Sequence, residues 1–227
     1  MVEFKLQSRL NRDFFMLGTI ISLILPLFIQ GQPVMAGEPK PIAVREFSLE
    51  KRYEDSFVNQ VFKDNILLTI KYLSGEKIDP KNIDWNKVET PFEQKIILKS
   101  GETFAFHDDV LPEYEGKIAK TTNAHFNSQE GFKSSGFLVG DGVCHLASLL
   151  YWIARDAGLE TTAQVNHNFA NIPEVPKEYG VSIYAYPGRQ ANDQLQNLYI
   201  TNTRDREIAF EFKYDGRNLK ISAVETL

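Results

Sequence analysis

The chain has 227 residues, of which 43% are hydrophobic and 24% charged, and its net charge at neutral pH is −5. This composition allows a core of ordinary size and excludes nucleic acid as an expected partner, because phosphate binding requires an excess of lysine and arginine. The single cysteine, Cys144, excludes an intramolecular disulfide.

The first 36 residues have the pattern of an export signal. A basic flank precedes an apolar run over residues 14–29, and Val34 and Ala36 are the small or branched residues that signal peptidase prefers. The run is shorter than the roughly 20 residues of a typical membrane span. We expect either a signal peptide cleaved after Ala36 or an anchor that holds the protein to the membrane through residues 14–29. In both cases the remaining chain is exported, and it is periplasmic, extracellular or anchored facing outside.

Two closely spaced prolines follow, and residues 37–47 are expected to form an extended linker. A helical N-terminal extension is predicted over residues 48–90, with Ser48 as its N-cap. Its main helix is amphipathic and ends at Ser74-Gly75. Trp85 is expected to anchor this segment to the core.

Two strands are predicted next, over residues 92–98 and 103–106, with a turn between them. Residues 107–139 are rich in loops and lack a clear period. We interpret the acidic residues of this segment, including Asp108 and Asp109, as solvated.

The strongest helical pattern begins at Cys144. An apolar stripe that includes Leu146, Leu149 and Leu150 follows it, and Gly158 ends the helix. Further strands are predicted over residues 161–165, 181–186, 198–203, 208–214 and 219–224, with an Asp-Gly hairpin turn before the last. The predicted fold class is therefore α+β: one central helix that starts at the cysteine and packs on an antiparallel sheet, plus an N-terminal helix.

Simple geometry predicts that Cys144 and His167 meet. A helix from Cys144 to Gly158 spans ~21 Å at about 1.5 Å per residue. A strand from Leu159 to His167 covers ~26 Å at about 3.3 Å per residue. Because a tight turn at Gly158 sends the strand back along the helix, His167 returns to the level of Cys144.

The chemistry of this pair has two interpretations. A cysteine at a helix N-terminus is stabilised as a thiolate, and an adjacent imidazole can take its proton and later protonate a leaving group. Alternatively, Cys144 is a buried apolar side chain and His167 a capping or core residue. The histidines of the loop-rich segment, His107 and His125, lack familiar metal-ligand spacing, so neither a metal nor another cofactor is expected.

Several separated motifs resemble, in order, those of the VanW-like domain family. Its Pro-Gly-Glu-x-Phe-Ser-Phe motif is similar to residues 100–106, and its Asp-Leu-x-Phe-x-Asn motif to residues 197–202. Its Gly-Gly-Gly-Val-Cys-Gln motif is similar to residues 140–145, which are followed by Ala-Gly-Leu-Glu at 157–160 and by His167. The resemblance covers roughly residues 92–224 and marks residues 91–227 as the VanW-like domain. Two residues depart from the family pattern, Asp141 and His145.

The resemblance implies an envelope location. The family takes its name from an accessory protein of glycopeptide-resistance clusters, and it is otherwise associated with bacterial envelope proteins and peptidoglycan. It does not supply a reaction.

The leading hypothesis is a Cys/His-dependent hydrolase or transferase that acts on peptidoglycan-type peptide or amide bonds. Cys144 attacks, His167 is base and then acid, and Asn202 orients the imidazole. The residues expected to bind the substrate surround the cysteine: Gly140, Asp141, Gly142, His145 and Ser148. The alternative is a non-catalytic envelope- or peptidoglycan-binding module, in which the Gly-rich turn and the helix start hold a carboxylate or a peptide terminus.

Overall fold

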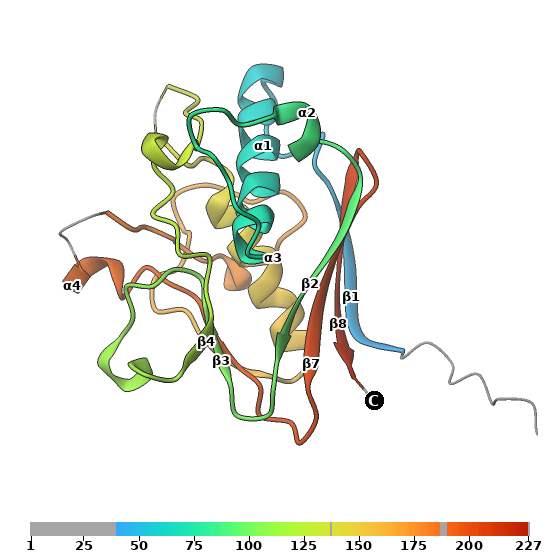
Figure 1. The fold of residues 1–227 in the computed structure, drawn as a ribbon, viewed down its shortest axis with the longest axis vertical. Coiled ribbons are helices and arrows are strands. Elements are labelled where there is room, and N and C mark those ends of the chain that lie inside the picture. The colour runs from blue at the N-terminus through green and yellow to red at the C-terminus, as the bar shows by residue number, and fades with distance from the viewer. Residues whose placement is uncertain (1–39, 137, 187–189, 227) are drawn as a thin grey trace, which may run out of the picture. The chain divides into compact units, whose positions relative to one another are not determined.

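One helix lies between two four-stranded sheets in the computed structural model, which describes residues 40–136, 138–186 and 190–226 (Figure 1). The helices are α1 (Ser56–Leu73), α2 (Trp85–Val88), α3 (Val143–Asp156) and α4 (Gln190–Asp193), with 3₁₀ turns at η1 (Pro112–Tyr114), η2 (Ser128–Glu130) and η3 (Lys177–Tyr179). The strands are β1 (Pro41–Ser48), β2 (Phe92–Leu98), β3 (Thr103–Ala105), β4 (Ile118–Lys120), β5 (Glu160–Thr162), β6 (Tyr199–Thr201), β7 (Ile208–Tyr214) and β8 (Asn218–Glu225).

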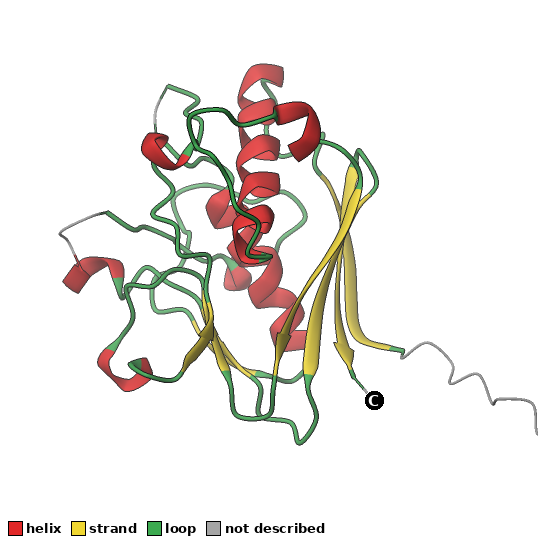
Figure 2. Ribbon diagram, in the orientation of Figure 1, coloured by secondary structure: helices red, strands yellow, loops and turns green. Residues whose placement is uncertain are grey.

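The larger sheet has the order β1-β8-β7-β2, and all of its neighbouring strands are antiparallel. In β7, Phe210, Phe212 and Tyr214 are buried, whereas Glu211 and Lys213 are exposed. This alternation is expected of a strand with one covered face. The buried face of the sheet is therefore apolar, and Figure 2 shows the helices on one side of this sheet.

The smaller sheet has the order β4-β3-β6-β5. Strand β3 is parallel to β4 and antiparallel to β6, and β5 is antiparallel to β6. Strands β2 and β3 are consecutive in the chain but belong to different sheets. The turn predicted between them thus carries the chain from one sheet to the other.

Helix α3 is central because it packs against β1 and β8 of one sheet and against β5 of the other. The predicted stripe is fully buried, with Leu146, Leu149, Leu150 and Ile153 at 0% exposure. Gly158 follows the last turn in the left-handed conformation (φ 70°), as a residue after a helix C-cap commonly does. The predicted α+β class, with its central helix on an antiparallel sheet, is confirmed.

Most predicted strands are present, with shifted ends. The strands predicted at 92–98, 208–214 and 219–224 correspond to β2, β7 and β8, and those at 103–106, 161–165 and 198–203 correspond to the shorter strands β3, β5 and β6. The prediction of a strand over residues 181–186 is wrong. Its backbone N–H groups at Val181 and Ile183 bind the side chains of Ser148 and Cys144 instead of a neighbouring strand.

The N-terminal part of the described chain corrects two predictions. The expected linker over residues 37–47 ends in strand β1, in which Phe47 is buried and residues 41–48 pair with β8. The N-cap of α1 is Asp55, whose carboxylate accepts a hydrogen bond from Val58 N–H at 3.0 Å, and not Ser48. The proline-rich composition led to the prediction of a linker, but proline is tolerated in a strand at the edge of a sheet.

Residues 48–90 carry helices, as predicted, but they pack into the same unit as the later elements. Helix α1 packs against α3 and contributes Ile66, Leu67, Leu68 and Ile70 to one continuous core. Trp85 packs at the edge of that core and is only partly buried. The signal or anchor predicted within residues 1–36 lies outside the described residues, among which no helix has the length and hydrophobicity to cross a membrane.

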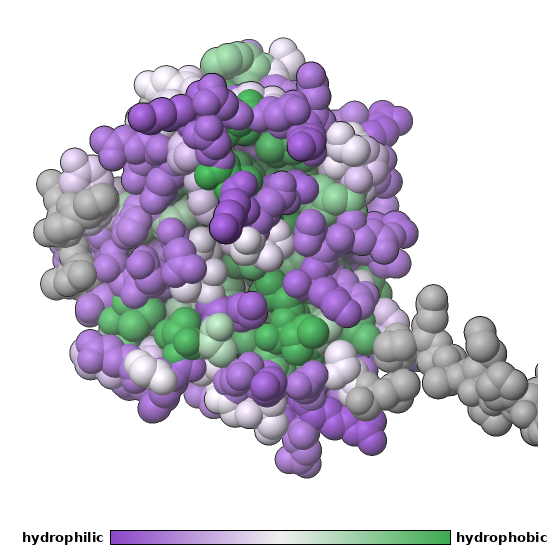
Figure 3. Space-filling model, in the orientation of Figure 1, coloured by the Kyte–Doolittle hydropathy of each residue, from purple (hydrophilic) through white to green (hydrophobic). Residues whose placement is uncertain are grey.

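The surface is mostly polar on the face shown in Figure 3. Hydrophobic side chains on that face gather across the lower half of the view, where the smaller sheet and β2 run.

Candidate functional site

The loop that leads into α3 is fixed by helix α1. The Asn65 side chain donates to the carbonyl oxygens of Lys133 and Asp141 and accepts from Lys133 N–H, at 2.8–3.0 Å. The Asp141 carboxylate in turn accepts from the N–H and hydroxyl of Ser135. Asp141, which was predicted to bind substrate, therefore also stabilises the loop that contains it.

Gly142 is the N-cap of α3 and has φ 99°, in the left-handed region. A Cβ atom at this position would lie 2.5 Å from the carbonyl oxygen of Phe62 in α1. Gly140 has φ 85°, and its Cβ would lie 2.8 Å from the carbonyl oxygen of Phe126. Both glycines are thus required by the backbone that approaches them. A glycine N-cap offers no side-chain hydrogen bond, so the N-terminus of α3 is left without a cap.

Cys144 faces the extended segment around Ile183. Its Sγ accepts a hydrogen bond from Ile183 N–H at 3.4 Å and donates to the Ile183 carbonyl at 3.6 Å. Burial raises the pKa of the Cys144 thiol to about 11, and the charge of Asp141 adds to this effect. The helix N-terminus does not overcome these effects, and the thiol is protonated at neutral pH.

His167 lines the same cavity as Cys144, but no hydrogen bond joins the two side chains in the described structure. Its Nδ1 lies 3.1 Å from the Ala170 carbonyl oxygen, which only a protonated nitrogen can bind. The tautomer is therefore Nδ1–H, and Nε2 carries the lone pair. Burial lowers the pKa of His167, which favours the neutral ring.

Two predicted site residues have structural contacts instead. The Ser148 hydroxyl donates to the Cys144 carbonyl and accepts from Val181 N–H, both at 2.8 Å, and so ties α3 to the segment over its N-terminal half. The Asn202 amide is fully buried, donates to the carbonyls of Leu98 and Arg206, and is not part of the cavity wall. The structure therefore does not bring Asn202 to His167, whose ring is oriented by Ala170.

His145 is 4% exposed and lines the cavity beside Cys144. Its ring packs edge-on against Phe62, and its Nδ1 is buried without a hydrogen-bond partner in the described chain. Burial lowers the pKa of His145 to about 3, and the nearby charge of Arg52 acts in the same direction. His145 is thus a neutral, unpaired imidazole.

Arg52 completes this wall of the cavity and comes from the segment ahead of α1. Its side chain is 1% exposed, and its Nη2 donates to the Glu174 carboxylate at 3.0 Å. Its Nε is buried without an acceptor in the described chain. Sequence reasoning missed Arg52, because nothing in the local pattern distinguishes it from a surface arginine.

The cavity has a volume of about 260 Å³, and a second one of about 340 Å³ adjoins it. Both are lined by Leu138, Val139, Gly140, Ile183 and Tyr184, so the two form one continuous depression, which we call the groove. Six of the nine exposed large apolar side chains in the described residues lie on it: Tyr53, Leu138, Val139, Phe169, Tyr184 and Tyr186. An apolar patch of this kind marks a binding surface.

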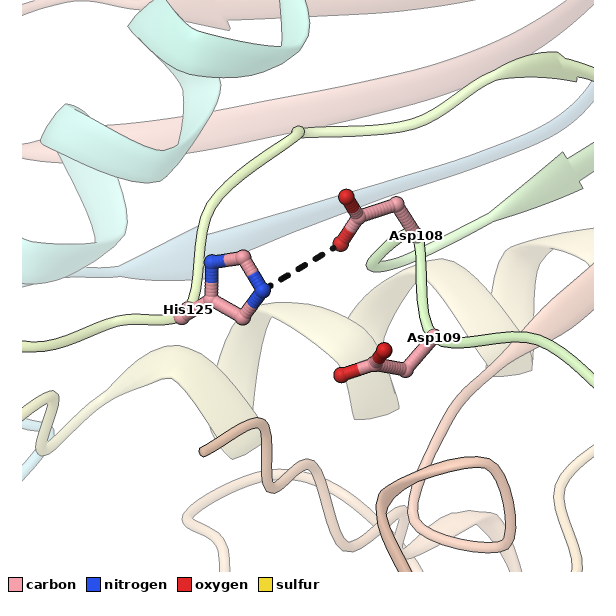
Figure 4. Close-up of side chains that lie close together, drawn as sticks. All are labelled: Asp108, Asp109 and His125. Carbon is pink, nitrogen blue, oxygen red and sulfur yellow. Dashed lines mark ion pairs between the residues drawn. The ribbon is translucent and has the colours of Figure 1, made fainter. Parts of the chain in front are cut away.

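A group of metal-ligand type lies at the far end of the groove, where His125 forms part of the wall (Figure 4). Asp108, Asp109 and His125 offer ligand atoms within 4.8 Å of one another. His125 Nε2 lies 3.5 Å from Asp108, and its Nδ1 lies 3.2 Å from the Glu130 carboxylate. A ring nitrogen bound to a carboxylate is typical of metal-ligating histidines, so among the described residues these are the ones that could hold a divalent cation.

The sequence interpretation of Asp108 and Asp109 as isolated solvated residues missed their proximity to His125. His125 is too distant in sequence to form a recognisable ligand motif with them. His107, the other histidine of this segment, is fully buried, and its ring binds the Gln196 carbonyl and the Asn197 amide.

Fold and site together define an α+β protein with a ligand-sized groove at an uncapped helix N-terminus. The family described as VanW like protein matches residues 91–224, more than half of the 227 residues. The chain belongs to this family, which confirms the resemblance inferred from its motifs. No curated protein and no solved structure shows a significant match to the chain. The matched range holds Cys144, His145 and His167, whereas Arg52 and α1 precede it.

Proposed function

We propose that this protein is exported to the bacterial envelope and that its groove binds peptide segments of the cell wall without forming a covalent bond. Export is supported by the signal-like pattern of residues 1–36. The choice of a wall peptide as ligand is supported by membership of the VanW-like family, whose resemblance implies an envelope location. Binding in place of catalysis is supported by one observation above all: the backbone of Ile183 holds the Cys144 sulfur in a position where burial raises the pKa of the thiol to about 11.

The groove suits an extended peptide. Its floor is made by the start of α3 and by Ile183, and its rim carries exposed aromatic and aliphatic side chains such as Tyr184 and Phe169. Exposed rings supply a large contact area at a low cost in conformational entropy. Small apolar side chains of a ligand can therefore pack along the groove.

Binding is tested by titrating purified wall peptides into the protein while NMR or calorimetry records complex formation. We expect saturable binding by the wild type and by Cys144→Ala, because the thiol contributes packing only. The substitution Tyr184→Ser, on the rim, is expected to weaken binding about tenfold through the loss of aromatic contact. Absence of binding to every wall peptide by the folded wild type would overturn the proposal.

The second candidate is the Cys/His-dependent hydrolase or transferase. It is favoured by the presence of Cys144 and His167 in one cavity and by the free Nε2 of His167. In that reaction Nε2 takes the thiol proton, the sulfur bonds to the amide carbonyl carbon, and the C–N bond breaks as the imidazolium protonates the amine. Water or another nucleophile then releases the acyl group from sulfur.

Turnover separates the two candidates. Mass spectrometry of peptidoglycan fragments incubated with wild type and with Cys144→Ala detects any cleaved or transferred product. We expect identical fragments from both proteins. A product formed by the wild type and lost in Cys144→Ala would establish the enzyme and displace the binding module.

A further inference from the structure

The groove contains donors for which the protein supplies no acceptor. The α3 N-terminus has no side-chain cap, and within the described chain the backbone N–H of His145 has no hydrogen-bond partner. A helix of this length presents a partial positive charge at that end. Helix N-termini of this kind bind anions such as carboxylates.

Two buried side chains point independently to the same conclusion. His145 and Arg52 both line the cavity, both are more than nine-tenths buried, and each has a nitrogen without a partner, Nδ1 in one and Nε in the other. An unpaired buried polar group carries a desolvation cost. A ligand oxygen in the cavity would remove part of that cost.

We propose that the deep end of the groove binds the C-terminal carboxylate of the peptide ligand, with the α3 N-terminus, His145 and Arg52 as the recognising groups. This inference rests on the proposed peptide binding and specifies which part of the peptide enters the cavity. The carboxylate accepts hydrogen bonds at the start of α3, and Arg52 supplies the full positive charge.

The other ionisable groups of this region have hydrogen bonds within the protein. The Asp141 carboxylate lines the cavity but is bound by the N–H and hydroxyl of Ser135. Glu174 binds the Nη2 of Arg52, and the Nε of Arg52 has no partner within the described chain. His167 is neutral, with Nδ1 turned to Ala170. Arg52 is the one lysine or arginine among the described residues that line this cavity, and its Nε is the nitrogen left to bind an incoming anion.

The test compares one wall peptide with a free C-terminal carboxylate and the same peptide as its C-terminal amide. Calorimetry is performed with wild type, His145→Leu and His145→Gln, after circular dichroism has shown that each variant is folded. We expect the wild type to bind the acid about tenfold more tightly than the amide. His145→Leu is expected to lose most of that preference, whereas His145→Gln, which retains an amide donor and matches the family motif, is expected to keep it.

The outcomes separate this inference from the proposed function. Equal affinity of the wild type for acid and amide would overturn the carboxylate site and leave peptide binding intact. Absence of binding to both peptides would overturn peptide binding and the carboxylate site with it. A preference for the acid that is unchanged in His145→Leu would remove His145 from the site, and Arg52→Gln then tests whether the charge of Arg52 alone accounts for the preference.

Discussion

At the scale of single residues, position at a helix N-terminus does not make Cys144 a thiolate. The stabilising effect of the helix dipole is limited to about 1 kcal/mol at most sites. Burial of the sulfur and the nearby Asp141 carboxylate act against it, and the result is a pKa of about 11. The chemistry of this cysteine is therefore set by its surroundings and not by its place in the helix.

A protonated thiol predicts slow alkylation. With a pKa of about 11, about one Cys144 side chain in ten thousand is ionised at pH 7. We expect the rate of modification by iodoacetamide to rise about tenfold per pH unit up to the pKa, as read by mass spectrometry. The urea-unfolded protein is the control and should react far faster at pH 7. Rapid alkylation of the folded protein at pH 7 would contradict the assigned protonation state.

Gly142 sets the approach of α3 to α1. In Gly142→Ala the new methyl group meets the Phe62 backbone, and the left-handed φ adds strain. We expect the free energy of unfolding to fall by about 3 kcal/mol, measured by urea denaturation. The control is Gly75→Ala, because Gly75 also has positive φ but no atom within 4 Å of its Cβ. A loss of about 1 kcal/mol is expected there, and equal losses would show that contact with α1 is unimportant.

At the scale of elements, α1 positions the site although it contributes little to the cavity wall. Its Asn65 holds both ends of the loop between Lys133 and Asp141, and its Phe62 lies beneath Gly142 and His145. The orientation of the Gly-rich turn therefore depends on a helix outside the matched family range.

This dependence predicts a large effect of a change remote from the groove. Asn65→Ala removes the side-chain partner of the Lys133 N–H and of the Asp141 carbonyl, whereas the Lys133 carbonyl keeps its hydrogen bond from Gly140 N–H. We expect a loss of about 3 kcal/mol in the free energy of unfolding, together with weaker peptide binding. Asn86→Ala, on the exposed side of α2, is the matched control and should change stability by less than about 0.5 kcal/mol. Similar values for the two variants would refute the role of Asn65.

Local sequence patterns predicted the elements that follow a regular period. The stripe of α3, the alternation of β7 and the Asp-Gly turn after it are properties of consecutive residues, and they are present as predicted. The segment over residues 181–186 has a strand-like composition, but its backbone is bound by Ser148 and Cys144. Such side-chain contacts depend on tertiary packing and leave no periodic signal.

The candidate site was predictable where helix and strand geometry or a family motif applies. Geometry brought Cys144 and His167 together, and the motif added the turn at 140–142 and His145. Arg52 and Ile183 reach the cavity through the fold, from far along the chain. Asn202 also matched a family motif, yet the hydrogen bonds of its side-chain amide stabilise the turn after β6.

At the scale of the whole molecule, the family range is smaller than the folding unit. Strand β1 covers the edge of β8, and α1 covers part of α3, but both precede residue 91. Without them, β8 has an unpaired edge and the core loses the apolar side chains of α1.

We therefore expect a fragment of residues 91–227 to be unfolded. The comparison is with residues 38–227, measured by circular dichroism and by the dispersion of amide NMR signals. The longer protein should show a cooperative thermal transition and the fragment none. A fragment with native-like dispersion would show that residues 38–90 are an independent appendage.

The pairing of β1 with β8 also determines when the protein can fold. Pro41–Ser48 and Asn218–Glu225 are neighbours in space but lie at opposite ends of the described chain. The larger sheet cannot close until the ribosome has released the last strand, and pairings this distant in sequence form slowly. A nascent chain with this topology leaves its larger sheet incomplete until β8 is available. Passage through a narrow translocation channel requires a chain that has not completed its fold. For a protein exported as proposed, the order of its strands thus delays folding in the way that this passage requires.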